Sequence, residues 1–223
     1  MRLLSGSKVV EAAPGWRESL PAGRPLIIDL GTGDGRFPYE RARDDPESLY
    51  IGVDAEATLM AAYAYRATRK PARGGVENVR FVVAAMEQLP PELCGLAVLV
   101  RVNFPWGGLL RGLLRPEPAT LAALAGLAAP QARFEIVLCY DPERDSAALA
   151  GGAALPAPDE RYVDTTLTPA YAESGILLDE RRRLTQDEAL AIPSSWGRRL
   201  LHGRPRDVLF FGGRLAGRDE RQG

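Results

Sequence analysis

The chain has 223 residues, of which 46% are hydrophobic and 26% are charged, so its composition is that of an ordinary globular protein. Its 28 basic and 29 acidic side chains give a formal net charge of −1, which neither favours nor excludes a nucleic-acid partner. One histidine and two cysteines exclude a multi-histidine or cysteine-rich metal site, and no apolar run is long enough for a membrane span. We therefore expect a cytoplasmic protein without a metal.

Strands and helices are predicted to alternate along the first two thirds of the chain. Short apolar runs followed by glycine or an acid predict strands, and longer runs that end at proline or glycine predict helices. The predicted strands cover 25–30, 48–54, 79–84, 96–102 and 133–140, and the predicted helices cover 38–43, 56–69 and 120–129. Such alternation at short spacing is typical of an α/β fold with a mostly parallel sheet.

The ends of the chain add smaller elements to this sheet. An N-terminal extension over 1–20 is expected to contain a hairpin at 3–11. Two late strands and one helix are predicted at 171–178, 207–214 and 186–192, and two inserted loops are expected at 141–166 and 193–206. The whole chain, 1–223, is thus predicted to form one domain with a seven-stranded sheet.

A glycine-rich loop follows the first predicted strand of the sheet. Glycines at 31, 33 and 35 let the backbone turn sharply and approach a ligand, and the next helix points its N-terminus at the same place. In dinucleotide dehydrogenases a related loop holds a pyrophosphate. Here Asp29 precedes the glycines and Asp34 lies among them, and their negative charge disfavours a pyrophosphate. Two carboxylates suit a cationic ligand such as S-adenosylmethionine.

Asp54 ends the second predicted strand, where an acid can accept hydrogen bonds from both hydroxyls of a ribose. Asp29 or Asp54 alone could equally be a helix cap or a polar strand end. Together with the glycine loop they indicate a class I S-adenosylmethionine-dependent methyltransferase with a Rossmann-like fold. The loop after the third strand, residues 84–90, would then lie against the adenine of the cofactor.

Two tryptophans and several arginines suggest the acceptor. The fourth strand ends in Asn103-Phe-Pro-Trp106, which is similar to the polar-proline-aromatic motif of methyltransferases that act on nitrogen. Trp196 lies in an acid-free, arginine-rich stretch at 194–206, and a second acid-free basic stretch covers 57–76. A core tryptophan and a solvated arginine face are the alternatives. Together, the features favour base stacking and phosphate contacts with RNA.

Six stretches make the resemblance specific. They are IDLGTGDGR (28–36), YIGVDAE (50–56), RKPARGG (69–75), AAMEQLP (84–90), FPWGGLLRG (104–112) and SSWGRRLLHGRPR (194–206). On these the chain resembles the 16S rRNA adenine-1408 N1-methyltransferases of the kanamycin–apramycin aminoglycoside-resistance type. The resemblance implies S-adenosylmethionine as cofactor, S-adenosylhomocysteine as product, and the decoding-site helix of the 30S subunit as substrate. It implies methylation of adenine N1, resistance to aminoglycosides and a monomer.

The resemblance also implies roles for individual residues. Cofactor contacts are implied for Asp29, Gly31, Thr32, Gly33, Asp54, Ala55, Ala84, Ala85, Glu87, Asn103, Gly108 and Ser194. A flipped adenine would be stacked and held by Trp106, Trp196, Pro105 and Arg206. Contacts to rRNA phosphates are implied for Arg66, Arg69, Lys70, Arg73, Arg199 and Arg204. Phe37 and Gly108 depart from the pattern, and their effect on activity stays open.

The implied chemistry needs no general base. Adenine N1 carries an in-plane lone pair that can attack a sulfonium methyl group directly, so orientation and base flipping would provide the catalysis. Three alternatives remain. The chain could methylate another structured RNA such as tRNA, it could bind cofactor and ribosome with weak or no activity, or it could be a dehydrogenase.

Overall fold

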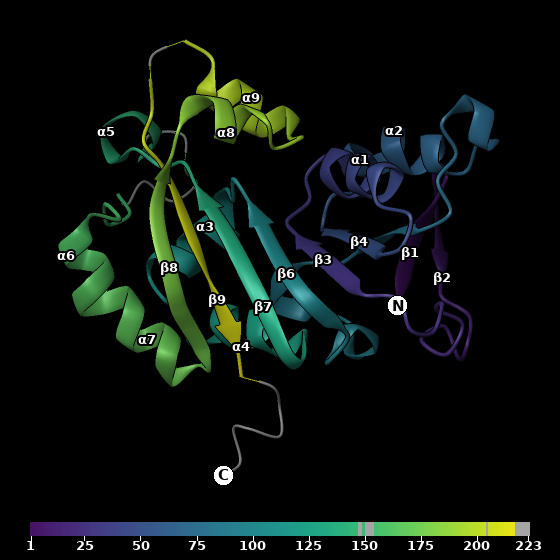
Figure 1. Cartoon of the computed structure of the whole chain (residues 1–223), viewed down its shortest axis with the longest axis horizontal. Helices are drawn as coiled ribbons and strands as arrows, with labels where there is room; N and C mark the ends of the chain where they lie inside the picture. The colour runs from purple at the N-terminus through teal and green to yellow at the C-terminus, as the bar shows by residue number, and fades with distance from the viewer. Residues whose placement is uncertain (147–148, 150–153, 204, 217–223) are drawn as a thin grey trace.

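The computed structural model describes residues 1–146, 149, 154–203 and 205–216, and a sheet of nine strands runs through this part of the chain (Figure 1). The strands are β1 (Arg2–Ser5), β2 (Lys8–Glu11), β3 (Leu26–Leu30), β4 (Leu49–Asp54), β5 (Val79–Val83), β6 (Ala97–Asn103), β7 (Ala128–Leu138), β8 (Ile176–Leu184) and β9 (Val208–Leu215). They follow the order β2-β1-β5-β4-β3-β6-β7-β9-β8. The five strands from β5 to β7 in this order pair in parallel, and the pairs at both edges are antiparallel.

The helices connect these strands. They are α1 (Arg36–Asp44), α2 (Ala57–Ala67), α3 (Gly107–Leu114), α4 (Pro118–Gly126), α5 (Pro142–Asp145), α6 (Glu160–Tyr162), α7 (Thr168–Glu173), α8 (Gln186–Leu190) and α9 (Ser195–Leu201). Short 3-10 turns form η1 (Pro71–Arg73), η2 (Met86–Gln88) and η3 (Pro91–Leu93), and a π-helical turn, η5 (Val163–Leu167), joins α6 to α7. No helix in the described ranges is long and apolar enough to cross a membrane.

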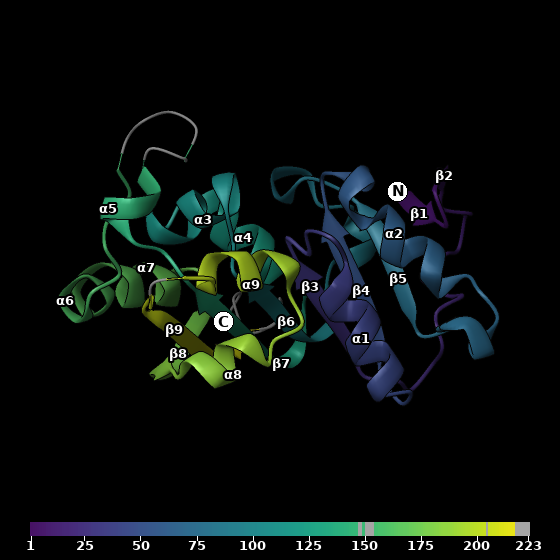
Figure 2. The same ribbon diagram turned by 90° about the horizontal axis from the view of Figure 1, so that it is seen from above.

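Helices cover both faces of the sheet, with α3 and α4 on one side and α1 and α8 on the other in Figure 2. On the first face, α3, α4 and α7 pack against strand residues such as Ile28 and Val100. On the second face, α1 and α2 pack against β4 and β5, while α8 and α9 pack against Val137 of β7 and Phe104. All five residues of β3 are buried, as expected for a central parallel strand with helices on both faces.

The strand order reverses at β3. The chain moves from β3 to β4 and β5 on one side and then returns to β6 and β7 on the other side. At such a point the loops after neighbouring strands diverge and leave a crevice at the carboxyl ends. The expected seven-stranded, mostly parallel sheet is confirmed. The N-terminal hairpin, which pairs β1 with β2, extends it to nine strands because β1 also pairs with β5.

The strand expected at 171–178 is wrong in its first half, because this part of the chain forms the end of α7. Val163, Leu167 and Tyr171 recur every four residues and are all buried, so they form one face of a helix. The hydroxyl of Tyr171 donates a hydrogen bond of 3.1 Å to the backbone of α3. The strand β8 begins only after Gly175, which has φ +78°.

Short helices occupy parts of both segments expected to be loops, 141–166 and 193–206. The first segment contains α5, α6 and most of η5, and the second contains α9. Each of these helices has a polar cap, because the side chains of Asp141, Asp159 and Ser194 accept hydrogen bonds from backbone N–H groups in the first turns of α5, α6 and α9. These N-caps explain where such short helices begin in otherwise irregular sequence.

The helix expected at 120–129 also ends early. The helix α4 stops at Gly126, and β7 starts at Ala128. Ala97 of β6 pairs with Ala128, and its N–H donates to the carbonyl of Leu127 at 2.9 Å. Strand pairing therefore overrides the helix preference of the alanines. The helix α3 was not predicted, because its first residues are glycines.

We predict that Gly112→Ala destabilises the fold and that Gly126→Ala does not. A Cβ atom at Gly112 would lie 2.0 Å from Oγ1 of Thr120, so α3 and α4 would be pushed apart, at a cost of about 1–3 kcal/mol. A Cβ at Gly126 meets nothing within 4 Å and adds helix propensity. Denaturant unfolding measures both variants, and equal effects would refute this account of the α3–α4 contact.

Candidate functional site

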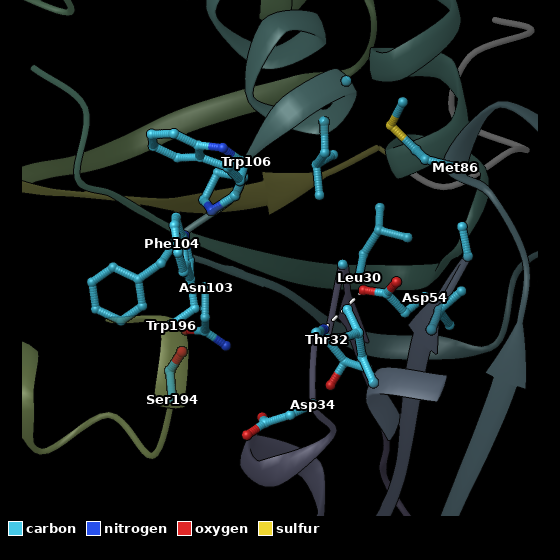
Figure 3. Close-up of a pocket in the computed structure, with 18 of the residues that line it drawn as sticks. Leu30, Thr32, Asp34, Asp54, Met86, Asn103, Phe104, Trp106, Ser194 and Trp196 are labelled. Atoms are coloured by element: carbon cyan, nitrogen blue, oxygen red, sulfur yellow. Dashed lines mark hydrogen bonds between the residues drawn. The ribbon is translucent and has the colours of Figure 1, made fainter. Parts of the chain in front are cut away.

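A cavity of about 510 Å³ opens at the carboxyl ends of the central strands. In Figure 3, Thr32, Asp34 and Asp54 lie on one side of it, and Trp106, Phe104 and Ser194 lie on the other. The first side comes from the loops after β3 and β4. The second side comes from the segment after β6 and from the start of α9. The cavity therefore occupies the crevice that the reversal of strand order creates.

The glycine loop is held in shape by β4. The N–H groups of Gly31 and Thr32 donate to the carbonyl of Val53 at 2.9 and 3.0 Å. The N–H of Gly33 donates to Oδ2 of Asp54 at 2.8 Å. Gly31 has φ +72°, and a Cβ there would lie 2.6 Å from a side-chain carbon of Leu109, so both conformation and space require glycine.

Asp54 also accepts a hydrogen bond of 3.0 Å from the N–H of Glu56 through Oδ1. Burial raises the pKa of the Asp54 carboxyl, and the backbone hydrogen bonds from Glu56 and Gly33 act against this shift. Each carboxylate oxygen has further lone pairs, and the residue lines the cavity. Asp54 can thus fix the glycine loop and accept hydroxyl donors at the same time.

Asp29 lies behind the loop rather than in the cavity. Its side chain is buried, and its Oδ1 accepts a hydrogen bond of 2.8 Å from Nδ2 of Asn103. Burial raises the pKa of Asp29 to about 6, although hydrogen bonds from neighbouring side chains and the charge of Arg101 lower it. Asp29 does not line the cavity, and the direct cofactor contact that the family resemblance implies for it stays a prediction. Its hydrogen bond orients Asn103, which does line the cavity.

Asn103 presents an unused acceptor at the cavity. It is 8% exposed and lines the cavity. Its amide nitrogen is engaged by Asp29, but Oδ1 is buried and has no hydrogen-bond partner among the described residues. Because a buried unpaired acceptor is costly, a ligand with a hydrogen-bond donor, such as an ammonium group, fits this position.

An aromatic wall closes the other side of the cavity. The rings of Trp106 and Trp196 meet edge to face, with centroids 5.1 Å apart and planes at 68°. Nε1 of Trp196 is buried without a partner in the described chain. A flat base does not fit between rings in this arrangement, so one ring has to turn or move before both can stack on a base.

Most of the predicted site residues come together in the cavity. Its lining includes Gly31, Thr32, Gly33, Asp54, Ala55, Ala84, Glu87, Asn103, Pro105, Trp106, Gly108, Ser194, Trp196 and Arg199. Asp29 and Ala85 do not line it. Gly108 lies beside Glu87, whose Oε1 would be 3.4 Å from a Cβ at that position. Phe37 is buried, with the guanidinium of Arg101 4.9 Å from its ring centre, and is not part of the lining.

Of the predicted RNA contacts that the structure describes, Arg199 lines the cavity and the others lie outside it. Exposed cations at the end of α2 and around η1 are Arg66, Arg69, Lys70 and Arg73. The loop that carries them is fixed by the hydroxyl of Tyr39, which donates to the carbonyl of Gly74 at 2.7 Å. Arg206 binds Asp145, which is 3% exposed, through three hydrogen bonds of 2.8–3.0 Å. Arg204 lies outside the described residues.

Sequence reasoning missed several lining residues. Leu59 and Leu109 lie in the first turns of α2 and α3. Phe104 lies between the predicted residues Asn103 and Pro105, and Ser195 lies between Ser194 and Trp196. The first turn of each helix after a parallel strand faces the same crevice as the strand end. From the sequence, this rule could have predicted that Leu59 lines the cavity. It could not be applied to Leu109, because α3 was not predicted.

These features define the class of protein. The central strands have the order β5-β4-β3-β6-β7-β9-β8 with β9 antiparallel to both neighbours, the glycine loop follows β3, and an acid ends β4. The chain has the fold and the cofactor cavity of a class I S-adenosylmethionine-dependent methyltransferase.

Comparison with known proteins gives the family. Residues 2–213 match the NpmA family, described as 16S rRNA (adenine(1408)-N(1))-methyltransferase. The protein of that name from Streptoalloteichus tenebrarius is 37% identical over 97% of this chain and 100% of its own length, and that from Escherichia coli is 32% identical over 97% and 99%. A mutant of the Catenulisporales acidiphilia enzyme, solved with cosubstrate SAM, has a TM-score of 0.87, 33% identity and coverage of 98% of both chains. This chain belongs to the 16S rRNA (adenine(1408)-N(1))-methyltransferase family.

We predict that Asp29→Asn changes stability in a pH-dependent way. The pKa of Asp29 is raised from 3.8 to about 6 in the fold, so its ionised form destabilises the native state. This penalty is absent below the unfolded value and complete above about 6. It corresponds to about 3 kcal/mol, from 1.36 kcal/mol per pKa unit.

The free energy of unfolding of Asp29→Asn minus that of the parent protein should therefore rise as the pH increases from 4 to 7. Denaturant titrations at several pH values measure this difference. Glu18→Gln, at an exposed position, is the control for a general charge effect. A difference that does not change with pH would contradict the claim that burial raises the pKa of Asp29.

Proposed function

We propose that this chain transfers the methyl group of S-adenosylmethionine to N1 of adenine 1408 in 16S rRNA. The observation that carries the proposal is the shape of one cavity, in which the glycine loop and Asp54 face Trp106 and Trp196. A donor site and a base-stacking site thus share the same space. The match over nearly the full length of relatives named for this reaction supports the same conclusion.

The residues of the first side of the cavity fit S-adenosylmethionine. Asp54 would accept hydrogen bonds from the ribose hydroxyls, and the small side chain of Ala84 leaves room for the adenine ring beside Met86. The unpaired Oδ1 of Asn103 would accept from the ammonium of the methionine part. When bound, the cofactor supplies a methyl group on an electron-poor sulfonium.

The aromatic wall would hold the target base. An adenine extruded from the rRNA helix would stack between Trp106 and Trp196 once their edge-to-face contact opens. Stacking on each ring contributes about 1–3 kcal/mol, which offsets the few kcal/mol needed to unstack the base. The backbone next to Pro105 would accept from the exocyclic amine and aim N1, whose lone pair needs no general base.

The surrounding cations would position the rRNA backbone. Arg199 lines the cavity, and the exposed cations near η1 lie on the loop fixed by Tyr39, so phosphate contacts at both places would fix the register of the rRNA. Arg206 is pre-oriented by Asp145, which suits a contact to the distorted backbone at the flipped nucleotide. We place Arg204 in the same group on the family resemblance alone.

The substrate sets the biological context of the proposal. Methylation of the decoding site in assembled 30S subunits would require the protein to act in the cytoplasm. The added methyl group would block drug contacts at this nucleotide and give aminoglycoside resistance. A monomer is sufficient, because donor and acceptor sites lie in one chain.

We predict that Trp106→Ala and Trp196→Ala abolish methyl transfer and leave cofactor binding nearly unchanged. Each variant loses one stacking face, while the glycine loop and Asp54 stay intact. Transfer from labelled S-adenosylmethionine to purified 30S subunits measures the first effect, and calorimetry with the cofactor measures the second. Full transfer by both variants would contradict the proposed stacking.

The same assays on the parent protein test the alternative functions. Cofactor binding without transfer by the parent protein would favour an inactive homologue, and transfer to tRNA alone would indicate a different substrate.

We also predict a difference between two neighbouring arginines of α9. Arg199 lines the cavity and Arg198 does not, although both are exposed. Arg199→Ala should weaken binding to 30S subunits by roughly 5- to 150-fold, as loss of about 1–3 kcal/mol implies, while Arg198→Ala serves as the matched control. Filter binding at two salt concentrations measures the effect. Equal losses in both variants would show that only the net charge of α9 matters.

A further inference from the structure

The helix α9 rests directly on the ring of Phe104. A Cβ atom at Gly197 would lie 2.5 Å from Cε2 and 2.6 Å from Cδ2 of this ring, which is closer than van der Waals contact allows. The backbone at Gly197 is helical, so its conformation would accept any residue. Glycine is required at this position for space alone. Gly197 is thus a point of close approach between α9 and the residue that follows β6.

Phe104 cannot move away to relieve such a clash. It is 2% exposed, and its φ of +51° is unusual for a residue other than glycine. Its N–H donates to the carbonyl of Val137 at 2.9 Å, and the preceding Asn103 is tied to Asp29. The ring therefore forms a fixed support at the end of β6, next to Pro105 and Trp106.

The other contacts of α9 hold the helix in place and so determine where Trp196 lies in the cavity. The N–H of Gly197 donates to Oγ of Ser194 at 3.0 Å and so fixes the first turn of the helix. Leu200 and Leu201 anchor the far end in the same apolar cluster as Phe104. Trp196, next to Gly197 in the chain, meets Trp106 at a centroid distance of 5.1 Å. A shift of α9 relative to Phe104 would change the spacing of the two tryptophans.

We propose that Gly197 and Phe104 are positioning residues whose contact sets the spacing between Trp106 and Trp196. The inference rests on the proposed function, since it assigns the contact to the alignment of the target base. It goes further by stating that a methyl group added at Gly197, which does not itself line the cavity, uncouples base alignment from cofactor binding.

Four proteins test the proposal: the parent protein, Gly197→Ala, Phe104→Leu and the double variant. Gly197→Ala should lower kcat on 30S subunits by roughly 100-fold, the size expected for a displacement of about 1 Å, with little change in KM or in the affinity for S-adenosylmethionine. The double variant should regain most of this loss. Leucine has no Cε2 or Cζ, and its two δ carbons sit on an sp3 Cγ that can rotate them away from the new methyl group, whereas Cδ2 of the phenylalanine ring, 2.6 Å from that position, is held in the ring plane. Gly126→Ala, a glycine substitution in open space, is the control.

Circular dichroism gives a readout that does not depend on the substrate. The Trp106–Trp196 contact should produce an exciton couplet, which Trp196→Ala removes and which Gly197→Ala should weaken. An unchanged couplet with full kcat in Gly197→Ala would overturn the proposal, as would a double variant no better than the single one. Failure of the parent protein to methylate 30S subunits would refute the proposed function, while the couplet still tests the contact.

If Gly197→Ala does not fold, the comparison of Phe104→Leu with the double variant decides. The proposal predicts that alanine at position 197 has little effect on kcat or on the couplet once the ring is absent. A large further loss in the double variant would show that glycine is needed for another reason, and would overturn the proposal.

Discussion

The reversal of strand order at β3 is the constraint on which the site depends. It makes the segments after β3, β4 and β6 diverge at one edge of the sheet, so a cavity forms between them. The hydrogen bond from Gly33 to Asp54 ties two of these segments together. Leu109, in the helix that follows β6, packs so closely on Gly31 that no Cβ fits there. The segment after β6 is thereby in contact with the glycine loop. Contacts within the protein therefore hold the cofactor side of the cavity together.

The acceptor side is built differently. Phe104 is locked at the end of β6, and the short helix α9, which carries Trp196, rests on it at Gly197 and is anchored by Leu200 and Leu201. The ring of Trp196 contacts Trp106 edge to face, in the space that a stacked base would need. The donor site is thus already formed, whereas one tryptophan ring has to turn before a base can enter. Such a division suits an enzyme that must hold its cofactor and also admit a base extruded from a large RNA.

The parts of the structure that depend on local sequence were predictable. The glycine loop, Asp54 and the hairpin all follow from neighbouring residues, and Trp106 and Trp196 stood out because of what surrounds them. The location of Asp29 could not be read from the motif. Side chains alternate along β3, so Asp29 faces the side opposite to Ile28, toward Asn103 rather than into the cavity.

Long-range packing explains the remaining errors. The apolar residues around Tyr171 fit both a strand and a helix, and only contact with α3 selects the helix. The contact between Gly197 and Phe104 joins segments that are distant in the sequence, and glycine at position 197 has no local conformational signature. No sequence pattern of a single chain marks such a contact.

The central claim is that the cavity aligns N1 of one decoding-site adenine with the methyl donor. Primer extension across the decoding site of 30S subunits, after incubation with the protein and S-adenosylmethionine, tests it most directly. A methyl group at N1 blocks base pairing, so the account predicts a new stop at adenine 1408 that requires the cofactor. Methylation of the subunit at any other nucleotide, or no stop despite bound cofactor, would contradict it.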